Sequence, residues 1–193
     1  MDFNFLVRSV RGIIHDPVKE WDLIQAENKS SLYFSMNLLF PLLVLASISA
    51  FLGSLLFTNT VLKGSYSILS GVKFFILLCL AIYGTTLIFK ELTTSLGIRK
   101  DFASSFKIIV CSAVPFLLCQ IVTRLFESFI FINILSFYGI YILWAGIERL
   151  TSPPERKKML LTVSAFIAFI ALLAVSNWIL TLVFDKIYFS VFA

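Results

Sequence analysis

The side chains that could do chemistry in this chain are mostly amides set within long apolar stretches. Asn37, Asn133 and Asn177 each lie in such a stretch, where an amide inside a membrane would seek a hydrogen-bond partner on a neighbouring helix. Pro41 and Pro115 each leave the carbonyl four residues earlier without its helical amide donor. These five positions either hold helices together or open a polar path. We favour the first, because charges are nearly absent from the same stretches.

The sequence lacks the sets of residues that most enzymes use. His15 is the only histidine, which excludes clusters of histidine ligands and a Ser–His pair within the membrane. Cys79, Cys111 and Cys119 have no CxxC spacing, and we expect them to behave as small buried apolar residues. No P-loop or dinucleotide-binding glycine pattern occurs, and no carboxylate lies in the middle of an apolar stretch. We therefore expect a non-enzymatic protein without a metal or cofactor.

The composition indicates that lipid is the solvent for much of this protein's surface. The chain has 193 residues, of which 59% are hydrophobic and 14% charged, and its mean hydropathy is +0.96. A soluble domain carries about 25% charged residues, and 21 Phe cannot all be buried in a small water-soluble core. The net charge of +5 could suggest nucleic acid as a partner. We reject that reading, because basic residues that flank apolar segments usually set membrane orientation.

Five stretches of the sequence are apolar enough and long enough to cross a membrane. A helix needs about 20 residues to span the hydrocarbon core of a bilayer. The alternating pattern of a membrane barrel is absent, so we expect helices, which bond their own backbone groups internally. The sequence therefore predicts an all-α integral membrane protein with a single domain over residues 1–193. Its five transmembrane helices are expected at about 31–57, 67–90, 103–123, 128–147 and 159–184.

Lys and Arg are divided unevenly between the two sides of this arrangement. Twelve of the 16 lie in the N-terminal tail and in the second and fourth loops with their margins, and four lie on the other side. Cytoplasmic loops of membrane proteins carry an excess of Lys and Arg. We therefore expect the N-terminus in the cytoplasm and the C-terminus outside.

Residues 1–30 are expected to form a cytoplasmic tail with two short helices. Apolar residues recur at helical spacing up to residue 15, while Arg8 and Arg11 lie on a different face. This pattern fits an amphipathic helix in the membrane interface, and it fits equally well a helix packed on the bundle. Asp16 and Pro17 are typical of the N-cap and first residue of a second helix. In that helix Trp21 would be an anchor at the membrane interface.

The expected cytoplasmic face carries most of the charged side chains, so we expect lipid or partner contacts there. Each Lys or Arg near an anionic bilayer contributes about 1 kcal/mol of attraction. The alternative is that these charges only fix the topology. The candidate contacts are Arg8, Arg11, Trp21, Arg99, Lys100, Arg149, Arg156, Lys157 and Lys158.

Small residues follow one another at helical spacing in the first apolar stretch, at Ala46, Ser49, Ala50 and Gly53. Such residues let a second helix approach closely. That second helix could belong to the same bundle or to a second copy of the chain in a homodimer.

Two segments of the sequence resemble the Yip-domain family. They are "IIHDPVKEWDLI", before the first span, and "YGIYILWAGIERL", which ends the fourth span and is followed by a loop with Pro and Lys. The five spans and the cytoplasmic N-terminus agree with the compact prokaryotic members. The eukaryotic branch is associated with Rab GTPases, vesicle transport and membrane shaping, but its long N-terminal region and "DLYGP" element are missing here. The resemblance thus implies a bacterial inner membrane rather than the Golgi, and leaves GTPase binding without support.

Two functions of different classes fit these observations. The first is a non-enzymatic scaffold that organises membrane or docks lipids and partner proteins, as the family resemblance implies. The second is a small transporter or channel that uses the polar residues in kinked spans. Transporters commonly contain internal repeats and broken helices. We find no convincing repeat and no ionisable residue in the middle of a span, so we favour the scaffold.

Overall fold

The computed structural model of the chain describes residues 2–57, 63–98 and 101–192, and these ranges contain helices and no β-strand. Two of the candidate contacts, Arg99 and Lys100, lie outside the described residues. Five of the helical segments are long and apolar enough to cross a membrane. The predicted class, an all-α integral membrane protein with five apolar spans, is therefore confirmed, and the outward apolar side chains of these segments contact the lipid bilayer.

The N-terminal tail folds into two short helices, α1 (Phe3–His15) and α2 (Pro17–Glu27). The Asp2 side chain caps α1 by accepting a hydrogen bond from the amide of Phe5. The Asp16 side chain caps α2 in the same way, with Pro17 in the first turn, where a missing N–H costs nothing. Asn28 ends α2 in the left-handed conformation. Side-chain caps therefore define both helices, although each is too short to be stable alone in water.

The first span is interrupted by a turn of π-helix. It begins as α3 (Ser31–Phe34), widens into η1 (Ser35–Leu39) and continues as α4 (Phe40–Phe57). Pro41 has no amide hydrogen to donate, and the amide of Phe40 reaches back to the carbonyl of Ser35, as in a π-helix. Pro115, in contrast, lies inside a helix that stays α-helical from Phe102 to Leu125. Only the first of the two prolines is accompanied by a departure from α-helical geometry.

The remaining spans are longer or less regular than the sequence predicts. The second is α5 (Lys63–Ser95), the third α6 (Phe102–Leu125) and the last α8 (Glu155–Phe192). The fourth combines a 3₁₀-helix, η2 (Glu127–Phe137), with an α-helix, α7 (Tyr138–Thr151).

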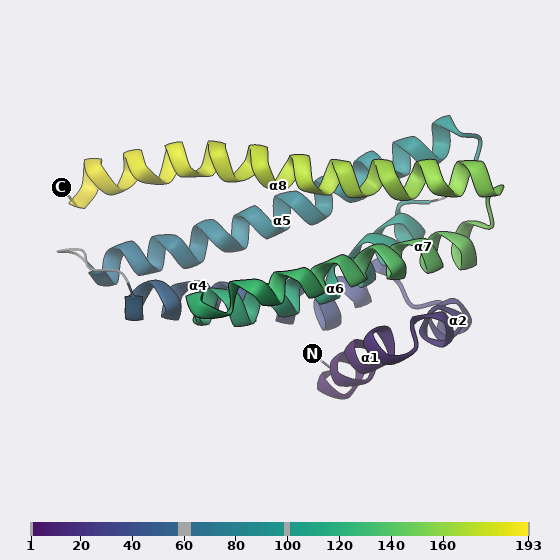
Figure 1. Cartoon of the computed structure of the whole chain (residues 1–193), viewed down its shortest axis with the longest axis horizontal. Coiled ribbons are helices and arrows are strands. Elements are labelled where there is room, and N and C mark those ends of the chain that lie inside the picture. Colours follow the sequence, from purple (N-terminus) through teal and green to yellow (C-terminus); the bar gives the residue numbers. More distant parts are fainter. Residues whose placement is uncertain (1, 58–62, 99–100, 193) are drawn as a thin grey trace.

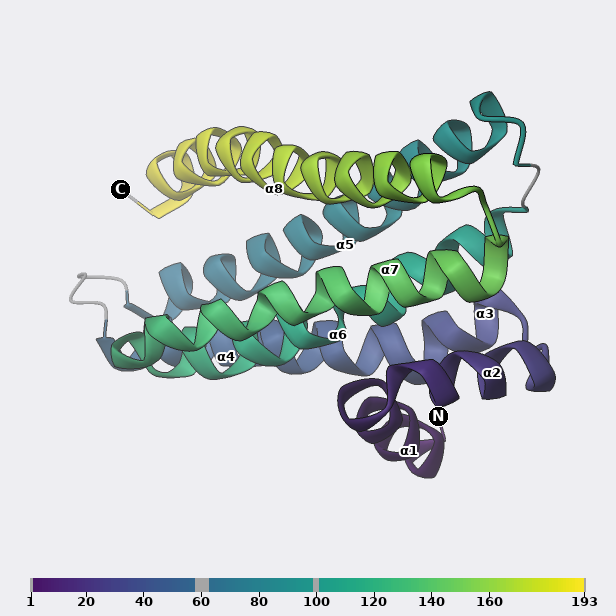
Figure 2. The same cartoon turned by 45° about the vertical axis from the view of Figure 1, so that its right-hand side comes forward.

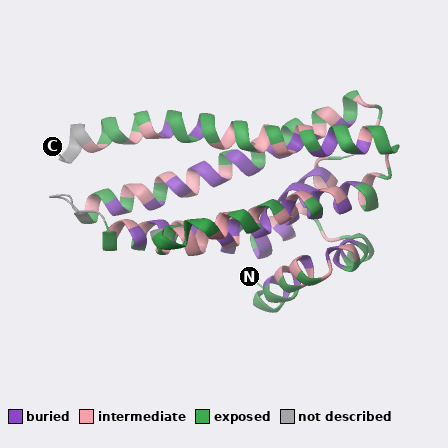
Figure 3. Cartoon of the chain, in the orientation of Figure 1, coloured by how far each residue is buried: buried purple, intermediate pink, exposed green. Residues whose placement is uncertain are grey.

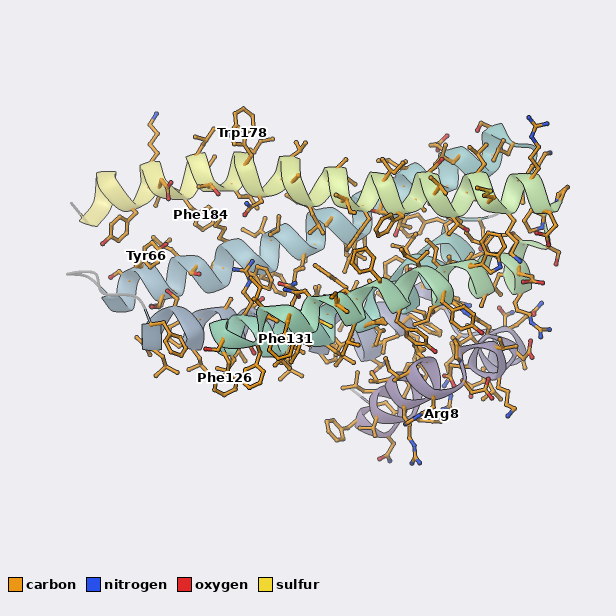
Figure 4. All side chains as sticks on the ribbon, viewed as in Figure 1. Arg8, Tyr66, Phe126, Phe131, Trp178 and Phe184 are labelled. Atoms are coloured by element: carbon orange, nitrogen blue, oxygen red, sulfur yellow. The ribbon has the colours of Figure 1, made fainter. Side chains whose placement is uncertain are left out.

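The five spans differ in burial, and α8 is the least buried of them. α8 packs mainly along α5, and α5 packs also along α4 and α6. α4 and α7 pack on α6, with α1 and α2 against one side of the bundle (Figures 1 and 2). The outward face of α8 is exposed along nearly its whole length (Figure 3). Trp178, 66% exposed, points away from the bundle (Figure 4). So large an exposed apolar surface is expected where lipid is the solvent.

The small residues of the first span bring α4 and α6 into close contact. Ala46, Ser49 and Ala50 are buried, and a Cβ atom added to Gly53 would lie 1.8 Å from the carbonyl oxygen of Arg124 in α6. The helix that these residues admit is therefore part of the same chain. A homodimer would have to use a different surface.

Candidate functional site

The first contact that positions the N-terminal helices is made by Asn37, at the π-helical turn. Its Oδ1 accepts a hydrogen bond from the amide of Asp2, at 2.7 Å, and its Nδ2 donates to the carbonyl of Tyr33, at 3.1 Å. The Tyr33 hydroxyl donates in turn to Oδ2 of Asp2, at 3.0 Å. Asn37 thus bonds the start of α1, and the prediction of a hydrogen-bond partner on a second membrane span is wrong for this residue.

Replacing Asn37 with leucine is expected to loosen α1 selectively. The amide of Asp2 would lose its acceptor, and leaving such a group unpaired costs about 1–3 kcal/mol. We expect hydrogen exchange in α1 to become faster by about tenfold or more, measured by mass spectrometry on the protein in lipid nanodiscs. The matched control is Asn177→Leu, because Asn177 is exposed on α8. Equal exchange rates in the two variants would contradict this role for Asn37.

Glu27 and Lys29 form a second contact beside α1. Glu27 pairs with Arg8 of α1, at 2.7 Å, and with Lys29, at 2.9 Å. These cations hold the pKa of the Glu27 carboxyl below its usual range, with Lys29 the larger cause. The ammonium of Lys29 also lies 4.3 Å from the ring centre of Phe5, a distance typical of a cation–π contact. Charge and aromatic contacts together fix α1 against the junction of α2 with the first span.

The turn between α1 and α2 buries a carboxylate. Glu20 is 4% exposed, and a Cβ atom on Gly12 would lie 2.1 Å from its Oε2. Burial raises the pKa of the Glu20 carboxyl, and the charge of Arg8 partly opposes this rise. The Glu20 carboxyl thus lies directly against the α-carbon of Gly12, and a larger residue at position 12 would have to displace this side chain.

Trp21 attaches α2 to α7 and is one of the largest fully buried side chains. It is 1% exposed, and its Nε1 donates to the carbonyl of Ile142, at 3.2 Å. A Cβ atom added to Gly146 of α7 would lie only 2.5 Å from the ring of Trp21. The prediction that Trp21 contacts lipid at the interface is therefore wrong, because Gly146 opens a slot for the ring within the protein.

The basic residues that follow α7, at the start of α8, make more contacts within the protein than the sequence suggests. Lys158 is 3% exposed, bonds Glu148 at 2.5 Å and lies 4.1 Å from the ring centre of Trp144. Lys157 donates to the carbonyl of Leu96 at the end of α5, at 2.8 Å. The prediction of Lys158 as a lipid contact is wrong, since a buried ammonium paired with a carboxylate holds α7 and α8 together.

Other basic side chains remain available to a ligand or lipid. Arg156 and Arg11 are exposed, and half of the Arg8 side chain is exposed although it pairs with Glu27. Figure 4 shows Arg8 pointing outward from α1. Arg149 is 47% exposed and lies 3.5 Å from Asp22 of α2, so it adds a weak tie between α2 and α7.

A shallow apolar groove separates α1 from the bundle. Phe3 and Val7 of α1 line one wall and are 67% and 50% exposed, and Leu45 of α4 lines the other and is 47% exposed. The groove has a volume of about 430 Å³, with Arg11 and His15 among its lining residues. An apolar groove with the guanidinium of Arg11 at its lining is suited to the acyl chains and phosphate of a lipid.

Comparison with known proteins decides the family. The family model of the Yip1 domain matches residues 11–176. The chain belongs to the Yip1 domain family. No curated protein and no solved structure matched the chain significantly. The matched region of this Yip1 domain includes α2, with Trp21, and the first four spans, and it ends within α8.

The three span asparagines of the Yip1 domain lie in separate environments. Asn133 accepts a hydrogen bond from Gln120 of α6, at 3.1 Å, whereas Asn177 lies on the exposed face of α8. Asn37 faces α1. They do not line one path, and the partner across the bundle that the sequence predicts for Asn177 is not found among the described residues. Within those residues no group of His, Cys, Asp and Glu is placed to hold a metal.

The sequence did not indicate two residues of the Yip1 domain that contact the candidate site residues. Gln120 is the partner of Asn133, and a polar residue within an apolar stretch could have indicated it. Gly146 makes room for Trp21. It lies 125 positions further along the chain, so no local pattern could link the two.

Proposed function

We propose that this Yip1-domain protein is a non-enzymatic, membrane-organising scaffold that engages anionic lipid through α1 and the basic residues near it. The observation that carries the proposal is the fixed position of α1. Asn37 and Trp21 attach the two tail helices to the bundle, and Glu27 at the end of α2 pairs with Arg8 of α1. Phe3 and Val7 nevertheless stay exposed beside Arg11. A helix held in this way presents apolar and cationic side chains to a membrane surface together.

This proposal includes an orientation and a location. The N-terminal tail packs toward the end of the bundle at which α5 and α7 end and α6 and α8 begin (Figure 1). Twelve of the 16 Lys and Arg residues belong to the tail and to the second and fourth loops with their margins. The positive-inside rule then favours a cytoplasmic location for this end. The bacterial inner membrane is part of the proposal, and the resemblance to prokaryotic members of the family supports it.

A reporter fusion tests the orientation directly. A phosphatase that becomes active only outside the cytoplasm, fused after residue 193, is expected to be active. The same enzyme placed before residue 1 is expected to be inactive, because the basic end of the bundle stays in the cytoplasm. The opposite pair of activities would overturn the orientation.

Neutralising the exposed cations tests the lipid contact. In the Arg8→Gln, Arg11→Gln and Arg156→Gln triple variant, we expect the preference for anionic lipid to fall by up to about fivefold per cation, or about 1 kcal/mol each. The measurement is the relative association of spin-labelled phosphatidylglycerol and phosphatidylcholine with the reconstituted protein. High salt should produce the same loss in the unchanged protein, because it screens exposed charges.

The matched control keeps the charge. Replacing the same three residues with lysine should preserve most of the preference, because lysine retains the cation. If the glutamine and lysine variants and the unchanged protein share one preference, these charges serve only as topology signals and the proposal fails.

The transporter or channel has less support than the scaffold. Its polar path would need the amides of Asn37, Asn133 and Asn177 near one another. Instead they face α1, α6 and the exposed side of α8 respectively. Pro115, the second expected break, lies within a continuous α-helix.

A further inference from the structure

A cavity of about 300 Å³ lies among α5, α6, η2, α7 and α8, and it shares no lining residue with the groove beside α1. Its walls are mainly apolar, with Phe116 of α6, Leu143 of α7 and Phe169 of α8 among them. For comparison, an apolar cavity of about 150 Å³ stays free of water and binds benzene. This cavity is therefore large enough for a hydrocarbon chain and unsuited to water along most of its length.

One part of the cavity wall carries unsatisfied hydrogen-bond donors. Gln120 and Asn133 have four side-chain N–H groups between them, and among the described residues only one is bonded, from Gln120 Nε2 to Asn133 Oδ1 at 3.1 Å. The hydroxyl oxygen of Ser136, which also lines the cavity, is buried without a partner. Polar hydrogens at membrane depth need an acceptor, so an occupant with an acceptor oxygen would complete this group.

The depth of Gln120, Asn133 and Ser136 in the membrane matches that of a lipid ester group. Gln120 lies five residues before Leu125, the end of α6, which at 1.5 Å per residue is about 8 Å along the helix. The 24 residues of α6 span about 36 Å, slightly more than the roughly 30 Å hydrocarbon core. Gln120 thus lies just inside the edge of the hydrocarbon, next to the level of lipid ester groups.

The cavity reaches the lipid-facing surface. Two of its lining residues, Phe137 and Ile170, are 59% and 48% exposed. They come from the fourth span and α8, so a bilayer lipid can enter sideways between these two helices without leaving the membrane. The abundant hydrocarbon around the protein makes a lipid chain the occupant most favoured by concentration.

We propose that this cavity binds one acyl chain of a phospholipid from the leaflet opposite α1 and α2. The ester carbonyl of that lipid accepts hydrogen bonds from Asn133 and Ser136, while the chain extends along Phe116 and Phe169 toward the middle of the bilayer. The site is distinct from the groove beside α1, and it does not depend on the proposed scaffold function or on the orientation of the protein.

A photoreactive phospholipid tests this site. The protein is reconstituted in nanodiscs containing phosphatidylglycerol with a diazirine in one acyl chain, irradiated and digested, and adducts are located by mass spectrometry. We expect adducts at the cavity walls, on Phe116, Leu143 or Phe169, in addition to those on exposed faces. Adducts confined to exposed faces of the unchanged protein would overturn the proposal.

Two variants separate the cavity from the general lipid surface. Ala165 of α8 is 1% exposed and lines the cavity, so Ala165→Phe should fill it and reduce cavity adducts several-fold. Ala174→Phe is the matched control, because Ala174 is exposed on the same helix. Equal cavity labelling in both variants would contradict the assignment.

A second variant, which removes part of the polar group, covers the case in which Ala165→Phe does not fold. Asn133→Leu keeps the cavity apolar but removes two donors, and we expect cavity adducts to fall while adducts on the exposed face of α8 persist. A free fatty acid with the same diazirine distinguishes the ligand. If it labels the cavity and the phospholipid does not, the assignment to a bilayer phospholipid is wrong.

Discussion

Replacing Trp21 with alanine is expected to detach α2 from the bundle and to destabilise the protein by about 3–5 kcal/mol, the usual cost of truncating a fully buried tryptophan. The ring is 1% exposed and fills the slot above Gly146, and its Nε1 bonds the carbonyl of Ile142. Alanine would leave a cavity that neighbouring helices cannot close. Thermal unfolding in detergent and proteolysis near Asn28 measure the two effects.

Trp178→Ala is the matched control for this prediction. Trp178 lies in the last span and is 66% exposed (Figure 4), so its truncation removes contacts with lipid rather than with protein. We expect little change in unfolding temperature and no added cleavage near the tail. Similar losses in both variants would mean that Trp21 does not carry the attachment of α2.

Replacing Gly53 with alanine is expected to destabilise the bundle, although alanine usually stabilises a helix. In a helix interior alanine is better than glycine by roughly 0.5–1 kcal/mol. Here the added Cβ atom would lie 1.8 Å from the carbonyl oxygen of Arg124, and that atom belongs to the backbone of α6. α4 and α6 would have to separate, at a cost of about 1–3 kcal/mol or more. Unfolding temperature and the yield of folded protein measure the effect.

Gly64→Ala provides the opposite expectation within the same protein. A Cβ atom at Gly64, near the start of α5, would meet nothing within 4 Å. This variant should be unchanged or slightly stabilised, because only helix propensity changes. The contact between α4 and α6 would be misassigned if Gly53→Ala were as stable as Gly64→Ala.

The two proposed lipid contacts lie toward opposite ends of the bundle. Asn37 and Trp21 hold α1 and α2 at one end of the bundle, whereas the cavity near Gln120 lies toward the other end. The two proposed lipid contacts would therefore face different leaflets. The triple arginine variant and Asn133→Leu test the two contacts separately.

The sequence predicted much of the fold, because the physics of membrane insertion acts on composition and length. Apolar stretches of about 20 residues or more are compelled to form helices where no water can bond the backbone. The first and third spans illustrate this, since helices occupy Ser31–Phe57 and Phe102–Leu125. The family resemblance also came from sequence, through the segments around Trp21 and Trp144, and the family match confirms it.

The candidate site was predicted less well, because exposure depends on partners far away in the chain. The sequence presented Trp21 and Lys158 as surface residues, yet both are buried. Trp21 enters a slot made by Gly146, and Lys158 pairs with Glu148. The apolar residues of α1 recur at helical spacing, which left open whether they contact lipid or the bundle. Ile13 is buried, whereas Phe3 and Val7 are exposed. Helical spacing defines an apolar face, and the neighbouring helices decide how much of it is covered.

By itself the sequence determined that this protein is a helical membrane protein of the Yip type, with five apolar spans and its cations concentrated in alternate segments. Hydrophobic burial and backbone hydrogen bonding are local requirements, and each stretch of residues meets them largely alone. Only the tertiary structure decided that Asn37 holds α1, that Gly53 admits α6 and that Gln120 meets Asn133. Each of these depends on two backbones meeting at one place, and hydrogen bonds and steric contacts act over a few ångströms in space, whatever the separation along the chain.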